Sequence, residues 1–163
     1  MRKLICLILI SFFTLSCEEG TNPGSVNRFF YLNSDASLPD PNDGLYLNWT
    51  DGNRIVFRYI LDHPDDVDIQ DDELTEIFWI EIPSGVTEFY QNLNTDADVE
   101  TYYTRMCYCG FSSFQFTELE VSGEKLRNET WEVSFKMKAK ADSFDAEFTL
   151  QDTGVYYPGQ REE

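Results

Sequence analysis

The sequence predicts an all-β fold, a single antiparallel β-sandwich of about 8–9 strands. Apolar and polar residues alternate with a period of two in segment after segment, turn-forming residues separate these segments, and no long pattern of period 3.6 occurs. Many short strands without helices are typical of sandwiches and barrels, so a lipocalin-like closed barrel is the alternative. The 147 residues that follow residue 16 are enough for one domain with a sizeable core.

The last two predicted strands carry the clearest alternation. Each has one apolar face and one polar face, and a short polar loop joins them, so they predict an antiparallel hairpin. The apolar positions are Trp131, Val133, Phe135 and Met137 in the first strand and Phe144, Ala146, Phe148 and Leu150 in the second.

A second hairpin is predicted at 45–61, with its turn at Asp51-Gly52-Asn53. A three-residue loop pairs Trp49 with Ile55 and puts the apolar residues of both strands on one face, whereas a two-residue loop puts them on opposite faces. Segment 76–82 is apolar on both sides, which predicts a central strand. Further strands are expected at 28–32, 86–91, 100–109 and 114–121.

Residues 1–16 have the pattern of a secretory signal peptide. Arg2 and Lys3 precede the mostly apolar run 4–15, which is shorter than the roughly 20 apolar residues of a membrane-spanning helix. Thr14-Leu15-Ser16-Cys17 resembles the lipobox of bacterial lipoproteins, which signal peptidase II cleaves before a lipid-modified cysteine. The resemblance implies cleavage between Ser16 and Cys17 and a stable membrane anchor through the lipidated Cys17.

The residues around the predicted domain divide the chain further. Residues 17–27 are expected to be the lipidated N-terminus and a flexible tether, 28–152 the domain, and 153–163 a polar C-terminal tail. Glu18-Glu19 resembles the acidic export signal of Bacteroidota surface lipoproteins. The predicted turn at Ser122-Gly123, followed by two long alternating strands, resembles small β-rich lipoproteins of that group. The resemblance implies an outer-membrane lipoprotein that is displayed at the surface, and it implies no activity.

Charge excludes some partners. The chain has 30 acidic and 12 basic residues, and loss of Arg2 and Lys3 with the signal peptide changes its net charge from −18 to −20. Such a surface repels nucleic acid and anionic lipid headgroups. The expected partners are therefore the membrane, through the Cys17 anchor, and an extracellular glycan, peptide or protein. In the barrel alternative, the ligand is a small apolar molecule.

Cys107 and Cys109 remain once Cys6 leaves with the signal peptide and Cys17 takes lipid. Alternate residues of a strand point to the same face, and their Cα atoms are roughly 6.5–7 Å apart. That distance is at the limit of disulfide geometry, so a bridge needs a local bulge. A local disulfide, two buried thiols and a metal or redox role all stay open.

The acidic run 62–73 raises the question of calcium. Oxygen-rich loops suit Ca²⁺, and Asp66, Asp68 and Asp72 are the first candidate ligands. An EF-hand counted from Asp66 needs Gly and Glu where Asp71 and Ile77 stand. A solvated loop is therefore the favoured interpretation, an irregular calcium site is the alternative, and no other cofactor is expected.

Catalysis finds little support. His63, the only histidine, lies in the acidic run and is predicted to be a surface residue. A glycosidase needs only two carboxylates, but no pair stands out among the many in this chain. The sequence thus predicts a non-enzymatic binding or scaffold module, with a carboxylate-based hydrolase as the least favoured function.

Overall fold

The computed structural model describes residues 24–37, 48–64, 74–95, 98–106, 114–142 and 145–160. These residues form eight strands, so the all-β prediction is confirmed. None of the described segments is a helix long and apolar enough to cross a membrane. The strands are β1 (Ser25–Ser37), β2 (Asn48–Asp62), β3 (Thr75–Pro83), β4 (Glu88–Asn92), β5 (Glu100–Met106), β6 (Phe114–Lys125), β7 (Trp131–Ala141) and β8 (Glu147–Pro158).

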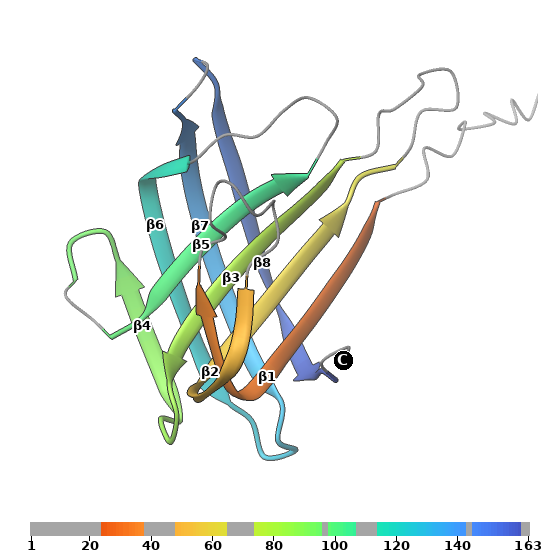
Figure 1. The fold of residues 1–163 in the computed structure, drawn as a ribbon, viewed down its shortest axis with the longest axis vertical. Helices are drawn as coiled ribbons and strands as arrows, with labels where there is room; N and C mark the ends of the chain where they lie inside the picture. The colour runs from red at the N-terminus through yellow and green to blue at the C-terminus, as the bar shows by residue number, and fades with distance from the viewer. Residues whose placement is uncertain are drawn as a thin grey trace, which may run out of the picture.

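All eight strands belong to one curled sheet, in the order β4-β6-β7-β8-β1-β2-β3-β5. We call β1, β2, β3 and β5 the first half and β4, β6, β7 and β8 the second half; the sheet curls so that the two halves face each other (Figure 1). Within the described residues, the edge strands β4 and β5 do not pair with each other. The architecture therefore lies between the predicted sandwich and the closed barrel.

The two halves are joined by a short parallel pairing between the first and the last strand. Phe29 lies opposite Tyr157 and Phe30 opposite Pro158, and the amide of Gly159 donates a hydrogen bond to the Phe30 carbonyl over 2.8 Å. The other six strand pairs are antiparallel. The prediction of a purely antiparallel sheet is wrong at this one pair, because β1 and β8 run in the same direction.

Aromatic rings fill the space between the halves. Phe57 of β2 lies with its ring centroid 5.2 Å from that of Trp131 and 5.8 Å from that of Tyr156. Phe78 and Phe135 make a similar contact across the core, at 4.6 Å. These rings come from both halves, so the core holds the halves together where backbone pairing does not.

The predicted hairpin of the last two strands is confirmed as the β7–β8 pair, and Trp131, Val133, Phe135 and Met137 all face the core. The predicted burial of both faces of 76–82 is also confirmed, since Ile77, Phe78, Trp79 and Ile80 are all less than 5% exposed. β3 lies between β2 and β5 rather than at an edge.

The predicted hairpin at 45–61 is wrong. Asp51-Gly52-Asn53 lies within β2, which pairs with β1 along its whole length, and Trp49 lies opposite Ala36 instead of Ile55. The register shifts at Ser34, which lies opposite both Asp51 and Arg54, so these turn-forming residues make a bulge. A Cβ on Gly52 would come within 2.0–2.3 Å of the Asp35 carboxyl group, so a larger residue at this position would displace the Asp35 side chain.

Three boundaries also differ from the prediction. β1 begins at Ser25, inside the expected tether, and β8 continues to Pro158, inside the expected tail, where Tyr156 is fully buried. Ser122-Gly123 is not a turn but lies within β6. The chain reverses after Lys125 instead, where the amide of Leu126 donates to the Thr130 carbonyl over 2.8 Å.

Candidate functional site

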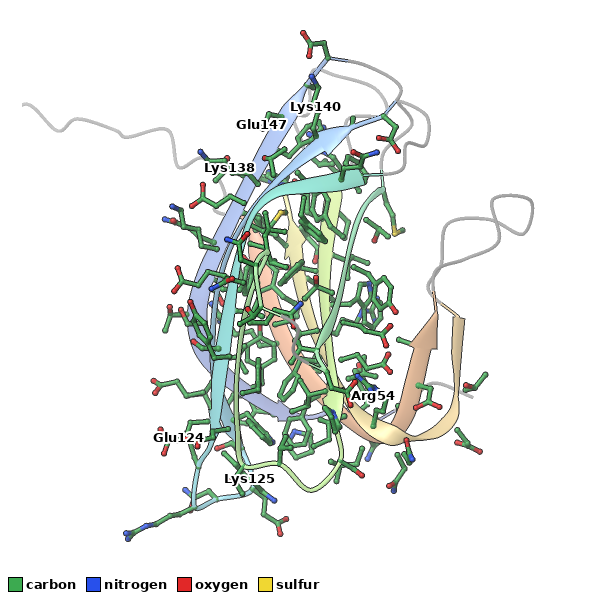
Figure 2. All side chains as sticks on the ribbon, turned by 90° about the vertical axis from the view of Figure 1, so that its left-hand side faces the viewer. Arg54, Glu124, Lys125, Lys138, Lys140 and Glu147 are labelled. Atoms are coloured by element: carbon green, nitrogen blue, oxygen red, sulfur yellow. The ribbon has the colours of Figure 1, made fainter. Side chains whose placement is uncertain are left out.

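The outer face of the second half is polar because strand alternation turns every apolar side chain of β7 inward. Its outward side chains are Glu132, Ser134, Lys136, Lys138 and Lys140, and antiparallel register lines them up with outward side chains of β6 and β8. Rows of polar side chains therefore run across the strands on this face. Figure 2 shows Lys138 of β7 and Glu124 of β6 on this face, pointing away from the packed core.

One row carries hydroxyl groups, and we call it the hydroxyl row. Tyr90 of β4 lies opposite Ser122 of β6, Ser122 lies opposite Ser134 of β7, and Ser134 lies opposite Thr153 of β8. The side chains of Ser134 and Thr153 are hydrogen-bonded to each other over 2.8 Å. The row thus spans all four strands of the second half.

The row next to it carries three glutamates, Glu88, Glu124 and Glu132, which we call the carboxylate row. Glu124 lies opposite both of the others. Among the described residues none of the three has an ion-pair partner, whereas the lysines further along β7 are paired: Lys138 with Glu118 over 3.2 Å, and Lys140 with Asp145 over 2.8 Å. Like charges directly opposite each other are unfavourable, so this row is a region of uncompensated negative charge.

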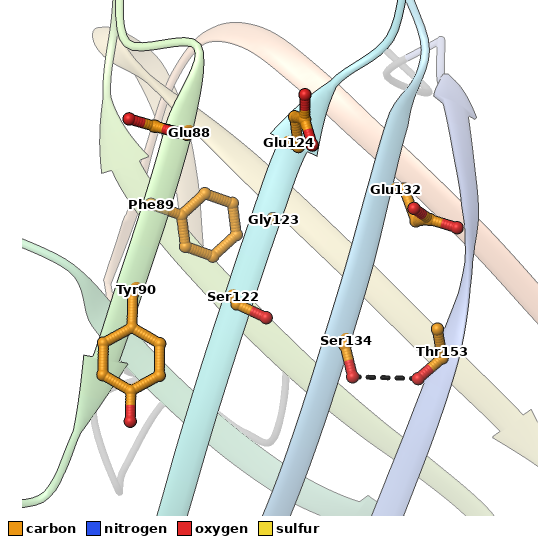
Figure 3. Close-up of a pocket in the computed structure, with 9 residues that line it drawn as sticks. All are labelled: Glu88, Phe89, Tyr90, Ser122, Gly123, Glu124, Glu132, Ser134 and Thr153. Carbon is orange, nitrogen blue, oxygen red and sulfur yellow. Dashed lines mark hydrogen bonds between the residues drawn. The ribbon is translucent and has the colours of Figure 1, made fainter.

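The two rows line a depression of about 550 Å³ (Figure 3). Tyr90 stands at its β4 edge with half of its side chain exposed. The phenol oxygen of Tyr90 accepts a hydrogen bond from Asn92 Nδ2 over 3.2 Å and donates one to Glu120 Oε1 over 3.4 Å. These two bonds orient the ring, so its aromatic surface lies beside the hydroxyl and carboxylate groups.

Gly123 of β6 leaves room for the side chain that lies opposite it on β4, Phe89. A Cβ on Gly123 would come within 2.3 Å of the Phe89 ring, which fills the space instead. Phe89 in turn packs against Phe57 and Trp131, with centroid distances of 5.5 and 6.0 Å. Phe89 therefore anchors the short edge strand that carries Tyr90 to the core, and Gly123 provides the space for its ring.

A second polar cluster lies at the end of the interior where β2 ends and β3 begins. Glu76 is buried, and its carboxylate accepts a hydrogen bond from Tyr103 and lies 2.7 Å from His63 Nε2. Arg105 Nε is 3.9 Å from the same carboxylate, and the Arg105 guanidinium covers the Phe148 ring at 4.4 Å. His63 was predicted to be a surface residue, but it is only about one third exposed and is bound to a buried glutamate.

Two further ion pairs strengthen the sheet. Arg28 of β1 binds Asp152 of β8 through two hydrogen bonds of 2.6 and 2.7 Å, and this bond to Asp152 raises the pKa of Arg28. Beside it, burial raises the pKa of Tyr59 to about 12. In the first half, Arg54 Nε lies 2.6 Å from the carboxylate of the buried Glu81, which also accepts the Ala36 amide over 2.8 Å. Both pairs have partners on different strands, which indicates a structural role.

The site residues predicted from the sequence lie outside the described residues. These are the cleavage site Ser16, the lipidated Cys17, Cys107, Cys109 and the candidate calcium ligands Asp66, Asp68 and Asp72. In the part of the chain that is described, no group of three or more histidine, cysteine, aspartate or glutamate side chains is arranged to hold a metal ion. The depression was not predicted, because it depends on the pairing of β4 with β6.

Comparisons of the chain with protein-family models, with curated proteins and with solved structures found no match. The function is therefore inferred from the geometry of the molecule. An open depression with hydroxyl, carboxylate and aromatic groups is suited to binding a polar ligand at the surface.

Proposed function

We propose that this chain is a lipid-anchored, non-enzymatic binding module that takes its ligand on the outer face of the second half. The observation that carries this function is the contrast between the filled interior and the polar depression outside it. A protein that stores a small apolar ligand needs an apolar cavity. Here the facing rings of Phe57, Phe78, Trp131 and Phe135 occupy the middle of the interior.

The position of the depression suits display from a membrane anchor. β1 enters the sheet in the upper part of the molecule (Figure 1), whereas Glu124 of the depression lies near the lower end (Figure 2). A tether from Cys17 would join the domain at Ser25, away from Glu124, so the attachment point would leave the depression uncovered. A flexible segment of about eight residues spans roughly 16 Å, which keeps the domain close to the bilayer but free to turn.

The anchor is tested by replacing the lipidated cysteine. The full-length precursor is expressed in its bacterial host. The wild type should be found in the membrane fraction, whereas Cys17→Ala should abolish lipid attachment and release the protein from the membrane. Cys6→Ala is the matched control, because it removes a thiol from the predicted signal peptide and should leave anchoring unchanged. Labelling with a radioactive fatty acid measures the lipid directly, and unchanged labelling of Cys17→Ala would contradict the proposal.

The binding surface is tested with the lipid-modified protein extracted in detergent. Immobilised glycans and peptides are screened, and each ligand found is measured again with Tyr90→Ala and with Tyr157→Ala. Both tyrosines are about half exposed on the second half, but only Tyr90 lines the depression. Binding that is lost with Tyr90→Ala and kept with Tyr157→Ala supports this surface, whereas equal binding by both variants would place the ligand elsewhere.

A further inference from the structure

We propose that the depression binds a linear polysaccharide that carries amino groups, with the sugar chain running across the strands along the hydroxyl row. This ligand assignment rests on the binding function proposed above and makes it more specific. Three features carry it: the spacing of the hydroxyl row, the uncompensated carboxylate row beside it, and the fixed aromatic ring at one end.

The hydroxyl row has the repeat of an extended sugar chain. Neighbouring strands lie roughly 5 Å apart, so the backbone positions that carry Ser122, Ser134 and Thr153 repeat at that step, and the hydroxyl groups of Ser134 and Thr153 form one hydrogen-bonded pair over 2.8 Å. That step is close to the length of one sugar residue in an extended chain. A second depression of about 350 Å³ shares Ser134 and Thr153 with the first and adds Lys136 and Gln151. Lys136 and Gln151 form the next row along β7 and β8, so the polar surface also continues along the strands.

A sugar fits this surface better than an extended peptide. Peptides that bind sheets use the free edge of a strand, where their amide groups find backbone partners. On the outer face of β6 and β7 the backbone is already paired within the sheet, so a peptide's amide groups would have only side chains to bind. Each sugar hydroxyl both donates and accepts, and it can pair singly with serine, threonine or glutamate.

The aromatic ring provides the apolar part of such a site. Tyr90 exposes half of its side chain at the β4 end of the hydroxyl row, and Asn92 and Glu120 hold its phenol group in place. The face of a sugar ring carries C–H groups that pack on an aromatic ring. A ring that is already oriented loses little conformational entropy when the sugar packs against it.

The carboxylate row sets the charge of the ligand. Glu88, Glu124 and Glu132 lie two residues along their strands from the hydroxyl row, roughly 7 Å away, which is within reach of a substituent on a sugar bound there. None of them has an ion-pair partner in the described part of the chain, and the whole protein carries a net charge of −18. An ammonium group would compensate this charge, whereas uronic acids and sulfated sugars would be repelled.

The experiment compares four oligomers of equal length on the detergent-extracted, lipid-modified protein by calorimetry. They are the hexamer of β-1,4-linked glucosamine, its fully N-acetylated form, a galacturonic acid hexamer and hexalysine. The glucosamine hexamer should bind at least tenfold more tightly than the acetylated one, and the galacturonic acid hexamer should not bind. Glu124→Gln should weaken glucosamine binding by about tenfold, since hydrogen bonds to charged groups are the stronger ones. It should leave the acetylated hexamer unaffected.

Two matched variants make the result decisive. Glu147→Gln removes a carboxylate from the same sheet face outside the depression, so it should leave all affinities unchanged, and Tyr90→Ala should weaken both glucosamine hexamers. Equal binding of the amino and acetylated hexamers would overturn the charge selection. Hexalysine binding that survives Tyr90→Ala, with no preference for glucosamine, would overturn the sugar assignment. If no glucosamine hexamer binds while another ligand binds in a Tyr90-dependent way, the ligand inference fails and the binding function stands.

Discussion

Inward and outward side chains alternate along the strands of both halves of the sheet, but the outward side chains differ between the halves. In the first half, β3 is buried on both faces, so Ile77 and Trp79 on its outer side are as well covered as Phe78 and Ile80 on its inner side. In the second half, β7 is buried on one face only, and its outer side carries glutamate, serine and lysine. Both halves contribute rings to the same core. Their outer faces are therefore where they differ.

The charged groups follow the same division. In the first half Glu76 and Glu81 are buried, and each lies beside an arginine from a neighbouring strand. In the second half Glu124 and Glu132 are exposed and have no ion-pair partner in the described residues. Buried and paired carboxylates build structure, whereas exposed and unpaired ones are free to meet a ligand. The second half is therefore the half whose outer face has charged groups accessible to a ligand.

The largest effect is expected where the halves meet. Phe57→Ala removes a ring that contacts Phe30, Phe89, Trp131 and Tyr156, and it leaves a cavity between the halves. The free energy of unfolding should fall by about 3–5 kcal/mol, measured by urea denaturation. A loss below about 1 kcal/mol would mean that the halves are not held by this ring cluster.

A smaller loss is expected at the join between β1 and β8. Arg28→Ala leaves Asp152 without its partner, and we expect a loss of about 1–3 kcal/mol, less than for fully buried pairs because Arg28 is 28% exposed. Adding Asp152→Asn should recover part of the loss, since it removes the unpaired charge. If the double variant is no more stable than Arg28→Ala, the pair does not couple the two halves.

The buried glutamate of the first half should make stability depend on pH. Burial raises the pKa of Glu81, although the Ala36 amide and Arg54 act in the opposite direction. The folded protein therefore binds this proton more tightly than the unfolded chain does, and the contribution of Glu81 is lost as the pH rises through its raised pKa. Relative to Glu81→Gln, the wild type should gain stability as the pH falls from neutral toward about 4. Parallel urea titrations at several pH values measure this, and a difference that stays constant with pH would contradict it.

The smallest effect on stability is expected at the open face. Tyr90→Ala should change the free energy of unfolding by no more than about 0.5 kcal/mol, because the ring is half exposed and belongs to no buried cluster of the described residues. The same urea experiment tests this. A loss of several kcal/mol would show that Tyr90 supports the fold and would end its interpretation as a ligand-facing residue.

The sequence predicted those parts of the fold in which the apolar pattern of a single strand shows which of its faces are buried. The alternation of Trp131, Val133 and Phe135 and the two-sided apolar run of β3 needed no knowledge of neighbours. The hairpin predicted at Asp51-Gly52-Asn53 was wrong because a bulge and a turn need the same residue types. Only the length of the neighbouring strand β1 decides between a bulge and a turn here. Residues 153–158 were predicted to belong to a polar tail, but they continue β8, and Tyr156 is buried in the core.

The candidate site could not be predicted from the sequence, for a different reason. Ser122, Ser134 and Thr153 are unremarkable singly and become a row only through the register of three strand pairs. Tyr90 joins that row because β4 pairs with β6 and not with β3, its neighbour in the chain. No local pattern contains this information, so the site could be found only in the folded molecule.

The pairing of the first strand with the last has a consequence for how the chain folds. β6, β7 and β8 follow one another in sequence and in the sheet, so their hairpins can form quickly from local contacts. β1 cannot meet β8 until almost the entire chain has been released, and such distant contacts slow folding. If the chain crosses a membrane from its N-terminus, β1 emerges first and waits longest, with the free edge that will pair with β8 unprotected. The early part of the chain would then be the stretch most in need of a chaperone during export.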